Sequence, residues 1–217
     1  PDGESPELVI EYPEQNSFIG FDTIEARFSA EARINPISGY LVEFDGSGWV
    51  DNGQSENITI HDIEEGPHTL KVRAFDLAEN YVDSSVQFTV DTMDPEITDI
   101  SPANGSYLRS RDFTLHFNGS DKTTRIEYFE TKLDDWNWVF HGMNNSRDFF
   151  DLAAGNHTII IRAYDRAGNF DEHVLRYFID LEPPRIDIIE PIEGHLTSKD
   201  NISVRWSGID SESGIDH

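Results

Sequence analysis

The chain has 217 residues, 37% of them hydrophobic and 12% aromatic. This composition excludes a disordered tail, which would be poorer in aromatic residues, and the length allows one large domain or two small ones. With 16 basic and 42 acidic residues the formal charge is −26, so nucleic acid is not an expected partner, because it would be repelled. Cysteine is absent, which excludes disulfides, thiolate nucleophiles and zinc–thiolate sites.

Residues 1–6 are typical of a linker, and an alternating pattern begins after them. Ile24, Ala26 and Phe28 are separated by charged residues, and such a period of two predicts a strand with one face in a core and one in water. Seven segments of this kind follow one another, near 7–12, 23–29, 38–45, 49–52, 56–61, 69–76 and 82–90.

The pattern then repeats without a gap. Residues 66–80 and 155–169 are identical at eight of 15 positions, at an offset of 89. The sequence therefore predicts a linker at 1–6, complete repeats at 7–95 and 96–184, and the truncated start of a third repeat at 185–217. We expect the apolar residues of this third segment to lack their partner sheet.

About seven short strands in a repeat of this length predict an all-β fold, with tandem immunoglobulin-like (Ig-like) or fibronectin-III-like antiparallel sandwiches. Trp49 and Trp138 occupy equivalent positions, and we expect both rings in the cores. The first repeat has Glu79 where the second has Gly168, which predicts a different hairpin turn there.

One motif occurs twice, at 66–80 and at 155–169. It reads Gly-x-His-Thr at 66–69 and continues as Arg-Ala-aromatic-Asp-x-Ala-x-Asn at 73–80. This motif resembles the closing hairpin of bacterial and archaeal Ig-like repeats. Phe44–Trp49 and the Asp91–Pro95 junction fit the same family. The resemblance covers nearly the whole chain after residue 6. It implies tandem domains of large cell-surface or secreted proteins, and no catalytic residue. The series is also similar to all-β modules that end some bacterial sensor ectodomains.

We find no catalytic motif in the sequence. It contains no nucleophile elbow, no His-Glu-x-x-His, no phosphate loop and no dinucleotide fingerprint. His68 and His157 recur at matching positions before a strand, where a histidine ring that hydrogen-bonds its own turn is the simpler interpretation. We therefore expect no enzymatic activity and no cofactor, calcium excepted.

A calcium site is a more specific hypothesis. Calcium takes six to eight oxygen ligands, mostly carboxylates and carbonyls, and an acidic chain can supply them. The loops of a seven-stranded sandwich would gather acids where the two repeats join. The candidates are Asp91, Asp94, Asp121 and Asp165. The alternative is that these acids are solvated or cap the backbone of their own turns.

Two further features concern the surface. Asn-x-Ser/Thr sequons predict N-glycosylation sites at Asn57, Asn104, Asn118, Asn144, Asn156 and Asn201. Trp136 belongs to the second repeat alone and is a candidate for stacking on a sugar ring.

The sequence thus predicts a non-catalytic spacer or adhesion segment of an exported cell-surface protein. A glycan-binding module or the extracellular part of a sensor is the alternative. The expected partners are neighbouring repeats of the same parent chain, with surface glycans or proteins as further candidates. No stretch approaches the about 20 apolar residues of a membrane span, so we expect no membrane insertion by this segment.

Overall fold

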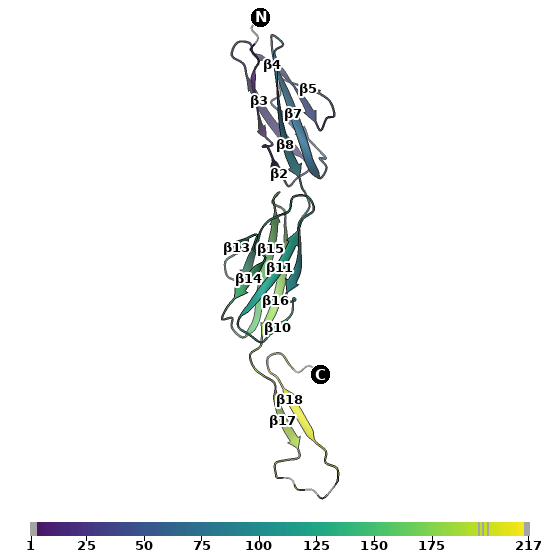
Figure 1. Cartoon of the computed structure of the whole chain (residues 1–217), viewed down its shortest axis with the longest axis vertical. Helices are drawn as coiled ribbons and strands as arrows, with labels where there is room; N and C mark the ends of the chain where they lie inside the picture. Colours follow the sequence, from purple (N-terminus) through teal and green to yellow (C-terminus); the bar gives the residue numbers. More distant parts are fainter. Residues whose placement is uncertain (1–3, 195, 197, 199, 215–217) are drawn as a thin grey trace. The chain divides into compact units, whose positions relative to one another are not determined.

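A computed structural model describes residues 4–194, 196, 198 and 200–214 (Figure 1), and every regular element among them is a β-strand. No helix capable of crossing a membrane occurs in this described part of the chain. The chain forms two compact units. The first contains residues Pro1–Glu96, Gly119–Tyr128 and Ala163–Asp171, and the second contains Ile97–Asn118, Phe129–Arg162 and Glu172–His217.

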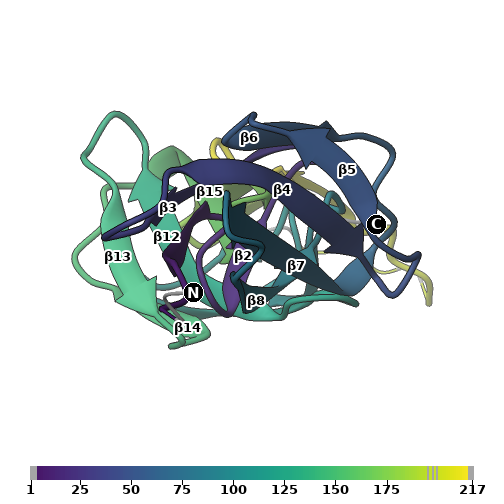
Figure 2. The same cartoon turned by 90° about the horizontal axis from the view of Figure 1, so that it is seen from above.

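The first eight strands form two sheets. The strands are β1 (Glu7–Tyr12), β2 (Ser17–Ile19), β3 (Ile24–Glu31), β4 (Ile37–Phe44), β5 (Val50–Gly53), β6 (Asn57–Ile60), β7 (Gly66–Asp76) and β8 (Tyr81–Val90). One sheet has the order β1-β3-β6 and the other the order β2-β8-β7-β4-β5. Figure 2 shows β5 beside β4, its antiparallel partner.

The next eight strands repeat this arrangement. They are β9 (Glu96–Ser101), β10 (Tyr107–Leu108), β11 (Phe113–Ser120), β12 (Ile126–Leu133), β13 (Val139–Gly142), β14 (Ser146–Phe149), β15 (Gly155–Asp165) and β16 (Phe170–Ile179). Their sheets have the orders β14-β11-β9 and β10-β16-β15-β12-β13. Two last strands, β17 (Arg185–Glu190) and β18 (Arg205–Ile209), pair only with each other among the described strands.

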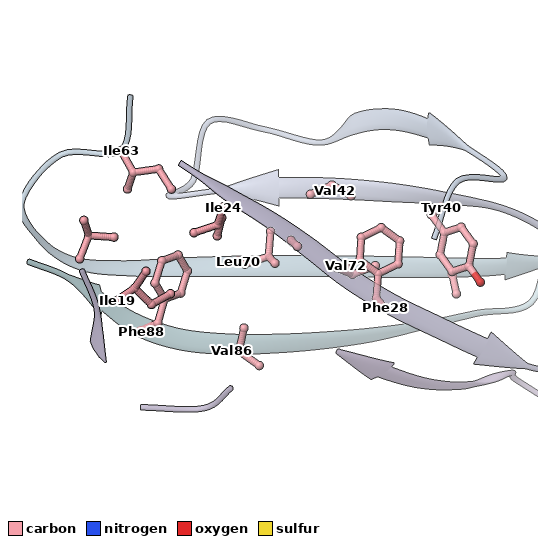
Figure 3. Packing of buried hydrophobic residues seen from close by; sticks show 13 residues of the cluster. Ile19, Ile24, Phe28, Tyr40, Val42, Ile63, Leu70, Val72, Val86 and Phe88 are labelled. Carbon is pink, nitrogen blue, oxygen red and sulfur yellow. The ribbon is translucent and has the colours of Figure 1, made fainter. Parts of the chain in front are cut away.

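The period-two pattern of the sequence produces the first core. Alternate residues of β7 point inward, and Leu70, Val72 and Ala74 are fully buried. Figure 3 shows Leu70 and Val72 among the apolar side chains that the two sheets contribute. The Phe28 and Tyr40 rings lie 5.1 Å apart between their centroids. Burying such side chains contributes about 1.5–3 kcal/mol each.

The prediction of a different turn at Glu79 is wrong. Glu79 has φ +66° and Gly168 has φ +91°, so both residues adopt the left-handed backbone conformation at the same place in their hairpins. In both hairpins the N–H of the aspartate donates to the carbonyl of the asparagine four residues later, at 3.0 Å from Asp76 to Asn80 and 3.1 Å from Asp165 to Asn169. Glutamate therefore adopts a conformation that favours glycine.

The expectation that Trp49 and Trp138 are core residues is also wrong, because both side chains are only half-buried. Each ring lies against an arginine that projects from the outer side of the five-stranded sheet. The guanidinium carbon is 4.8 Å from the ring centroid for Arg73 on Trp49 and 4.1 Å for Arg162 on Trp138. The tryptophans cover the outer face of the sheet instead of filling the inside of the sandwich.

Candidate metal centre

Asp91 follows the last residue of β8 and is completely buried. Its N–H donates to the Ile19 carbonyl at 2.9 Å. Its carboxylate accepts from the Thr124 hydroxyl at 2.5 Å and from the Met93 N–H at 3.2 Å. The backbone pairing beyond β8 thus holds the main chain at Asp91, and the hydrogen bonds from Thr124 and Met93 orient its carboxylate.

Asp121 and Asp165 stand at the ends of β11 and β15. Asp121 Oδ1 accepts from the N–H groups of Thr123 at 2.8 Å and Thr124 at 2.7 Å. Asp165 accepts from both the N–H and the side-chain amide of Asn169, at 2.9 and 2.7 Å. Each aspartate therefore caps its own turn, as the simpler interpretation of the sequence expects.

The three carboxylates nevertheless converge. Asp91, Asp121 and Asp165 each offer an oxygen within 4.8 Å of the others, and all three belong to the first compact unit. Asp94, the fourth sequence candidate, is exposed and does not belong to this trio. Asn169 extends the cluster, because its side-chain amide also donates to the Asp91 main-chain carbonyl at 2.8 Å.

The electrostatics of Asp91 reflect this crowding. Burial raises the pKa of Asp91, and the negative charges of Asp121 and Asp165 raise it further, while the hydrogen bond from Thr124 lowers it. For Asp121, burial also raises the pKa, but the backbone N–H donors around its carboxylate outweigh burial and hold the pKa below its usual range. A divalent cation among these oxygens would remove the repulsion, and so would a proton on Asp91.

Two members of the trio have counterparts 89 residues later, Asp180 and Asp210. Asp180 Oδ1 accepts from the Glu182 N–H at 3.0 Å. Asp210 Oδ1 accepts from the N–H groups of Glu212 and Ser213 at 3.0 and 2.9 Å. The turns around the trio are therefore a repeated property of the chain, and not an accident of one junction.

Sequence reasoning missed Thr124, which is buried and donates directly to Asp91. Its only signal was its place three residues after Asp121, within the turn that Asp121 caps. His68 and His157 fit their structural interpretation, because each ring nitrogen of both histidines contacts an acceptor of a nearby turn.

The surface candidates lie where side chains can reach solvent. Trp136 stands in the turn between β12 and β13 with 66% of its surface exposed. All six sequon asparagines are exposed, namely Asn57, Asn104, Asn118, Asn144, Asn156 and Asn201.

Comparison with known proteins identifies the fold. The fibronectin(III)-like modules of Clostridium thermocellum CbhA match with a TM-score of 0.57 and 15% identity, over 80% of this chain and 94% of that one. The sandwiches are fibronectin(III)-like. This likeness extends to the fold alone, since the identity is low. No protein-family model matches the sequence, and no curated protein matches it.

Other matches with lower TM-scores include the three N-terminal domains of the bacteriophage RB49 outer capsid protein Hoc. Its TM-score is 0.36 and its identity 13%, over 98% of this chain and 71% of that one. SGBP-B of Bacteroides ovatus, solved with a mixed-linkage heptasaccharide, has a TM-score of 0.33 and 13% identity over 80% of this chain and 47% of that one.

Proposed function

We propose that the chain is a non-catalytic spacer or adhesion segment of an exported cell-surface protein, built from the repeats at 7–95 and 96–184 and the start of a third at 185–217. The observation that carries the proposal is the hydrogen bond from the Asn169 side chain to the Asp91 carbonyl. It ties the closing hairpin of one repeat to the segment that ends the repeat before. A spacer needs such ties, because they limit bending where one sandwich follows another.

The distance between two spin labels tests this role directly. The chain has no cysteine, so Ser47→Cys and Asn137→Cys provide two unique labelling sites at exposed turn residues. We expect a narrow distribution of distances, broadened by Asn169→Ala because that variant loses the contact with Asp91. Arg109→Ala, away from this hydrogen bond, is the control. A broad distribution in the unsubstituted chain, unchanged by Asn169→Ala, would contradict a stiff spacer.

A calcium site at Asp91, Asp121 and Asp165 is a second element of the proposal. Its support is the convergence of three carboxylates on one buried aspartate. Calcium would stiffen this region by binding several loops at once. The test is a thermal melt in EDTA, in calcium, and in sodium chloride of matched ionic strength.

We expect calcium to raise the melting temperature beyond the salt control. Asp121→Asn should remove this excess, while Asp94→Asn, which changes an exposed acid outside the trio, should keep it. Equal stabilisation by calcium and by salt would instead mean that the charges are only screened.

Glycan recognition is the alternative function, and the exposure of Trp136 favours it. An exposed aromatic ring can stack on a sugar. A glycan array compares the unsubstituted chain with Trp136→Ala, and Phe150→Ala, which changes another exposed aromatic residue, is the control. Binding lost only in Trp136→Ala would support this function, and an array without signal would dismiss it.

We also infer that the exposed sequon asparagines carry glycans in the native host, which fits export. Intact-mass analysis of protein from that host tests this inference. A mass equal to that of the bare polypeptide would contradict it.

A further inference from the structure

The first compact unit contains a groove of about 460 Å³ where β2, β7 and β8 lie side by side. Its lining includes Asn16, Phe18, Thr69, Gln87 and Thr89, and we call it the β8 groove. Its volume lies within the range of about 300–1,000 Å³ that is usual for sites of small ligands.

The β8 groove lies on the outer face of the five-stranded sheet. Thr69 of β7 and Gln87 of β8 lie opposite each other. Side chains alternate between the two faces along a strand, and the adjacent residues His68 and Phe88 are buried. Thr69 and Gln87 therefore point away from the core.

Four polar side chains of the β8 groove are available to a ligand. The side-chain amides of Asn16 and Gln87 and the hydroxyls of Thr69 and Thr89 donate no hydrogen bond to any residue that the structure describes. The main chain beside them is held in place, because the Asn16 N–H donates to the Gln87 carbonyl at 2.6 Å and the Thr69 N–H donates to Asp45 at 2.7 Å. The groove thus combines a fixed backbone with four side-chain donors that a ligand can engage.

The β8 groove carries no net charge. Of the described residues that line it, none is an aspartate, glutamate, lysine or arginine, although these four types make up 27% of the chain. The lining residue His68 has both ring nitrogens occupied, by Asp45 Oδ2 at 2.6 Å and by the Glu64 carbonyl oxygen at 2.7 Å. A charged ligand would lose water here without gaining an opposite charge, so the groove favours a neutral one.

The second repeat shows which group the β8 groove lacks. There Tyr107 lies opposite Phe178, and their ring centroids are 5.5 Å apart. The equivalent pair of the first repeat, 89 residues earlier, is Phe18 and Thr89. Threonine is much smaller than phenylalanine, so the space of one aromatic ring is open beside Phe18. The Phe18 side chain remains 37% exposed, although the Arg166 guanidinium lies 5.3 Å from its ring centroid.

The two amides of the groove also belong to the first repeat alone. The second repeat has Gly105 in place of Asn16 and Arg176 in place of Gln87. Its strands have the same order in the sheet, so the fold does not require the amides. Their presence beside an open ring-sized space points to a ligand.

We propose that the β8 groove binds a neutral saccharide, with one sugar ring against Phe18 in the space that Phe178 fills beside Tyr107. A sugar ring has C–H groups on its face, which pack on an aromatic ring, and hydroxyls on its rim, which both donate and accept hydrogen bonds. The two amides and two hydroxyls of the groove can bind this rim. A purely apolar ligand would bury the same groups without partners. The inference goes beyond the spacer function, and it concerns a different repeat from the Trp136 candidate.

An NMR titration of the full chain tests the proposal, with backbone amide chemical shifts as the readout. The probes are glucose, galactose, N-acetylglucosamine and cellotriose, each up to about 50 mM, since we expect a Kd of about 1 mM for one ring in an open groove. At least one of these sugars should shift the amides of residues 16–18 and 87–89 without shifting those around Trp136. Glucuronic acid, which carries a carboxylate, is the charged control and should shift the groove amides less.

Two variants at one position separate shape from hydrogen bonding. Thr89→Phe introduces the residue that the second repeat has here, and it should abolish the shifts because its ring fills the space of the sugar. Thr89→Val keeps the shape of the side chain but removes the hydroxyl, and it should raise the Kd by about fivefold. Thr59→Phe places the same ring at an exposed residue of β6 and should leave binding unchanged. Unshifted amides outside the groove show that each variant is folded.

Several results would overturn the proposal. One is a titration in which no neutral saccharide shifts the groove amides, and another is binding that survives in Thr89→Phe. Equal shifts from glucuronic acid would contradict the preference for a neutral ligand. Groove shifts from N-acetylphenylalaninamide alone, a neutral peptide analogue, would make a peptide the ligand.

The same titration separates this site from the other proposals. Saccharide shifts confined to the surroundings of Trp136 would support the alternative glycan function and contradict the β8 groove as a sugar site. The spin-label distance does not enter any of these readouts, so this inference and the spacer function can fail separately.

Discussion

His157 lies between two acceptors. Its Nδ1 is 2.8 Å from a carboxylate oxygen of Asp134, and its Nε2 is 3.0 Å from the Ala153 carbonyl oxygen. Both contacts are best satisfied when both ring nitrogens carry hydrogen, as in the charged imidazolium. Burial lowers the pKa of His157, but the hydrogen bonds to Asp134 and Ala153 and the Asp134 charge outweigh burial and raise it.

Because its pKa is higher in the folded state than in the unfolded state, His157 stabilises the fold fully below about pH 6.5 and loses this effect as the pH rises through the folded pKa. We expect His157→Gln to lower the free energy of unfolding by about 1–3 kcal/mol at acidic pH, and by less at alkaline pH. Urea unfolding across the pH range measures this difference, with His116→Gln, an exposed histidine, as the control. A difference that stays constant with pH would contradict the argument.

His141 has the opposite preference. Its Nε2 is 2.8 Å from the buried Thr131 hydroxyl, which accepts at 2.7 Å from the guanidinium of Arg147. Burial lowers the pKa of His141, and the positive charge of Arg147 lowers it further. The folded second repeat therefore holds a neutral imidazole next to a charged guanidinium.

Protonation of His141 must then favour unfolding, so its effect on stability appears as the pH falls below about 6.5. Asn52 occupies the equivalent position of the first repeat and suggests the matched variant, His141→Asn. We expect this variant to lose less unfolding free energy on acidification than the unsubstituted chain, by about 1.4 kcal/mol for each pKa unit that separates the folded from the unfolded state. Parallel pH profiles of the two proteins would contradict this argument, because they would show that protonation of His141 does not change the free energy of unfolding.

Among the elements, the two closing hairpins offer a reciprocal experiment. Glu79 and Gly168 share a left-handed conformation, which costs a residue with a side chain about 1–2 kcal/mol more than glycine. We expect Glu79→Gly to stabilise the first repeat by about 1 kcal/mol, and Gly168→Glu to destabilise the second by a similar amount. Calorimetry of both variants measures this. Changes of the same sign would contradict the backbone argument.

The outer face of the five-stranded sheet depends on stacking instead of burial. Arg162 lies on Trp138 and also pairs with Glu172 at 2.7 Å. Since the tryptophan is half-buried, we expect Trp138→Ala to lower the free energy of unfolding by about 1–2 kcal/mol, less than the about 3–5 kcal/mol of a core aromatic. Denaturant titration beside the exposed Trp136→Ala checks this. A loss of about 3–5 kcal/mol would contradict the stacking argument, because it is the loss that a core ring would give.

Sequence predicts these elements well where alternation is strong. The seven expected strands of the first repeat all have counterparts, with ends displaced by a few residues. Strand β2 was missed, because three residues that pair in parallel with β8 are too few to show a period. The prediction that Trp138 lies in the core was wrong, because the repeat offset identifies Trp138 as equivalent to Trp49 without showing which face of the sheet the two rings occupy.

The candidate metal site was also predictable only in part from the repeat pattern. Repeat arithmetic and loop order were enough to bring Asp91, Asp121 and Asp165 together, but not to exclude the neighbouring Asp94. The polar group of Thr131, His141 and Arg147 was missed altogether. The sequence did contain a signal for this group. The equivalent residues of the first repeat are Val42, Asn52 and Ile58, so two positions that are apolar in the first repeat are polar in the second.

At the scale of the whole molecule, charge dominates. A net charge of −26 repels itself in the folded state, and salt screens this repulsion. We expect sodium chloride to raise the melting temperature by about 5 °C between low salt and about 0.5 M. A neutral osmolyte at equal osmolality is the control, and a melting temperature that falls with salt would mean that favourable ion pairs outweigh the repulsion.

The contact between Asn169 and the Asp91 carbonyl has a consequence for how such chains change over time. The acceptor is a main-chain oxygen, which every residue possesses. Most substitutions in the earlier repeat therefore leave this acceptor in place, provided the backbone keeps its path. Repeats joined in this way can be duplicated, exchanged or reordered without the co-adapted side-chain pairs that an interface between unlike surfaces would demand.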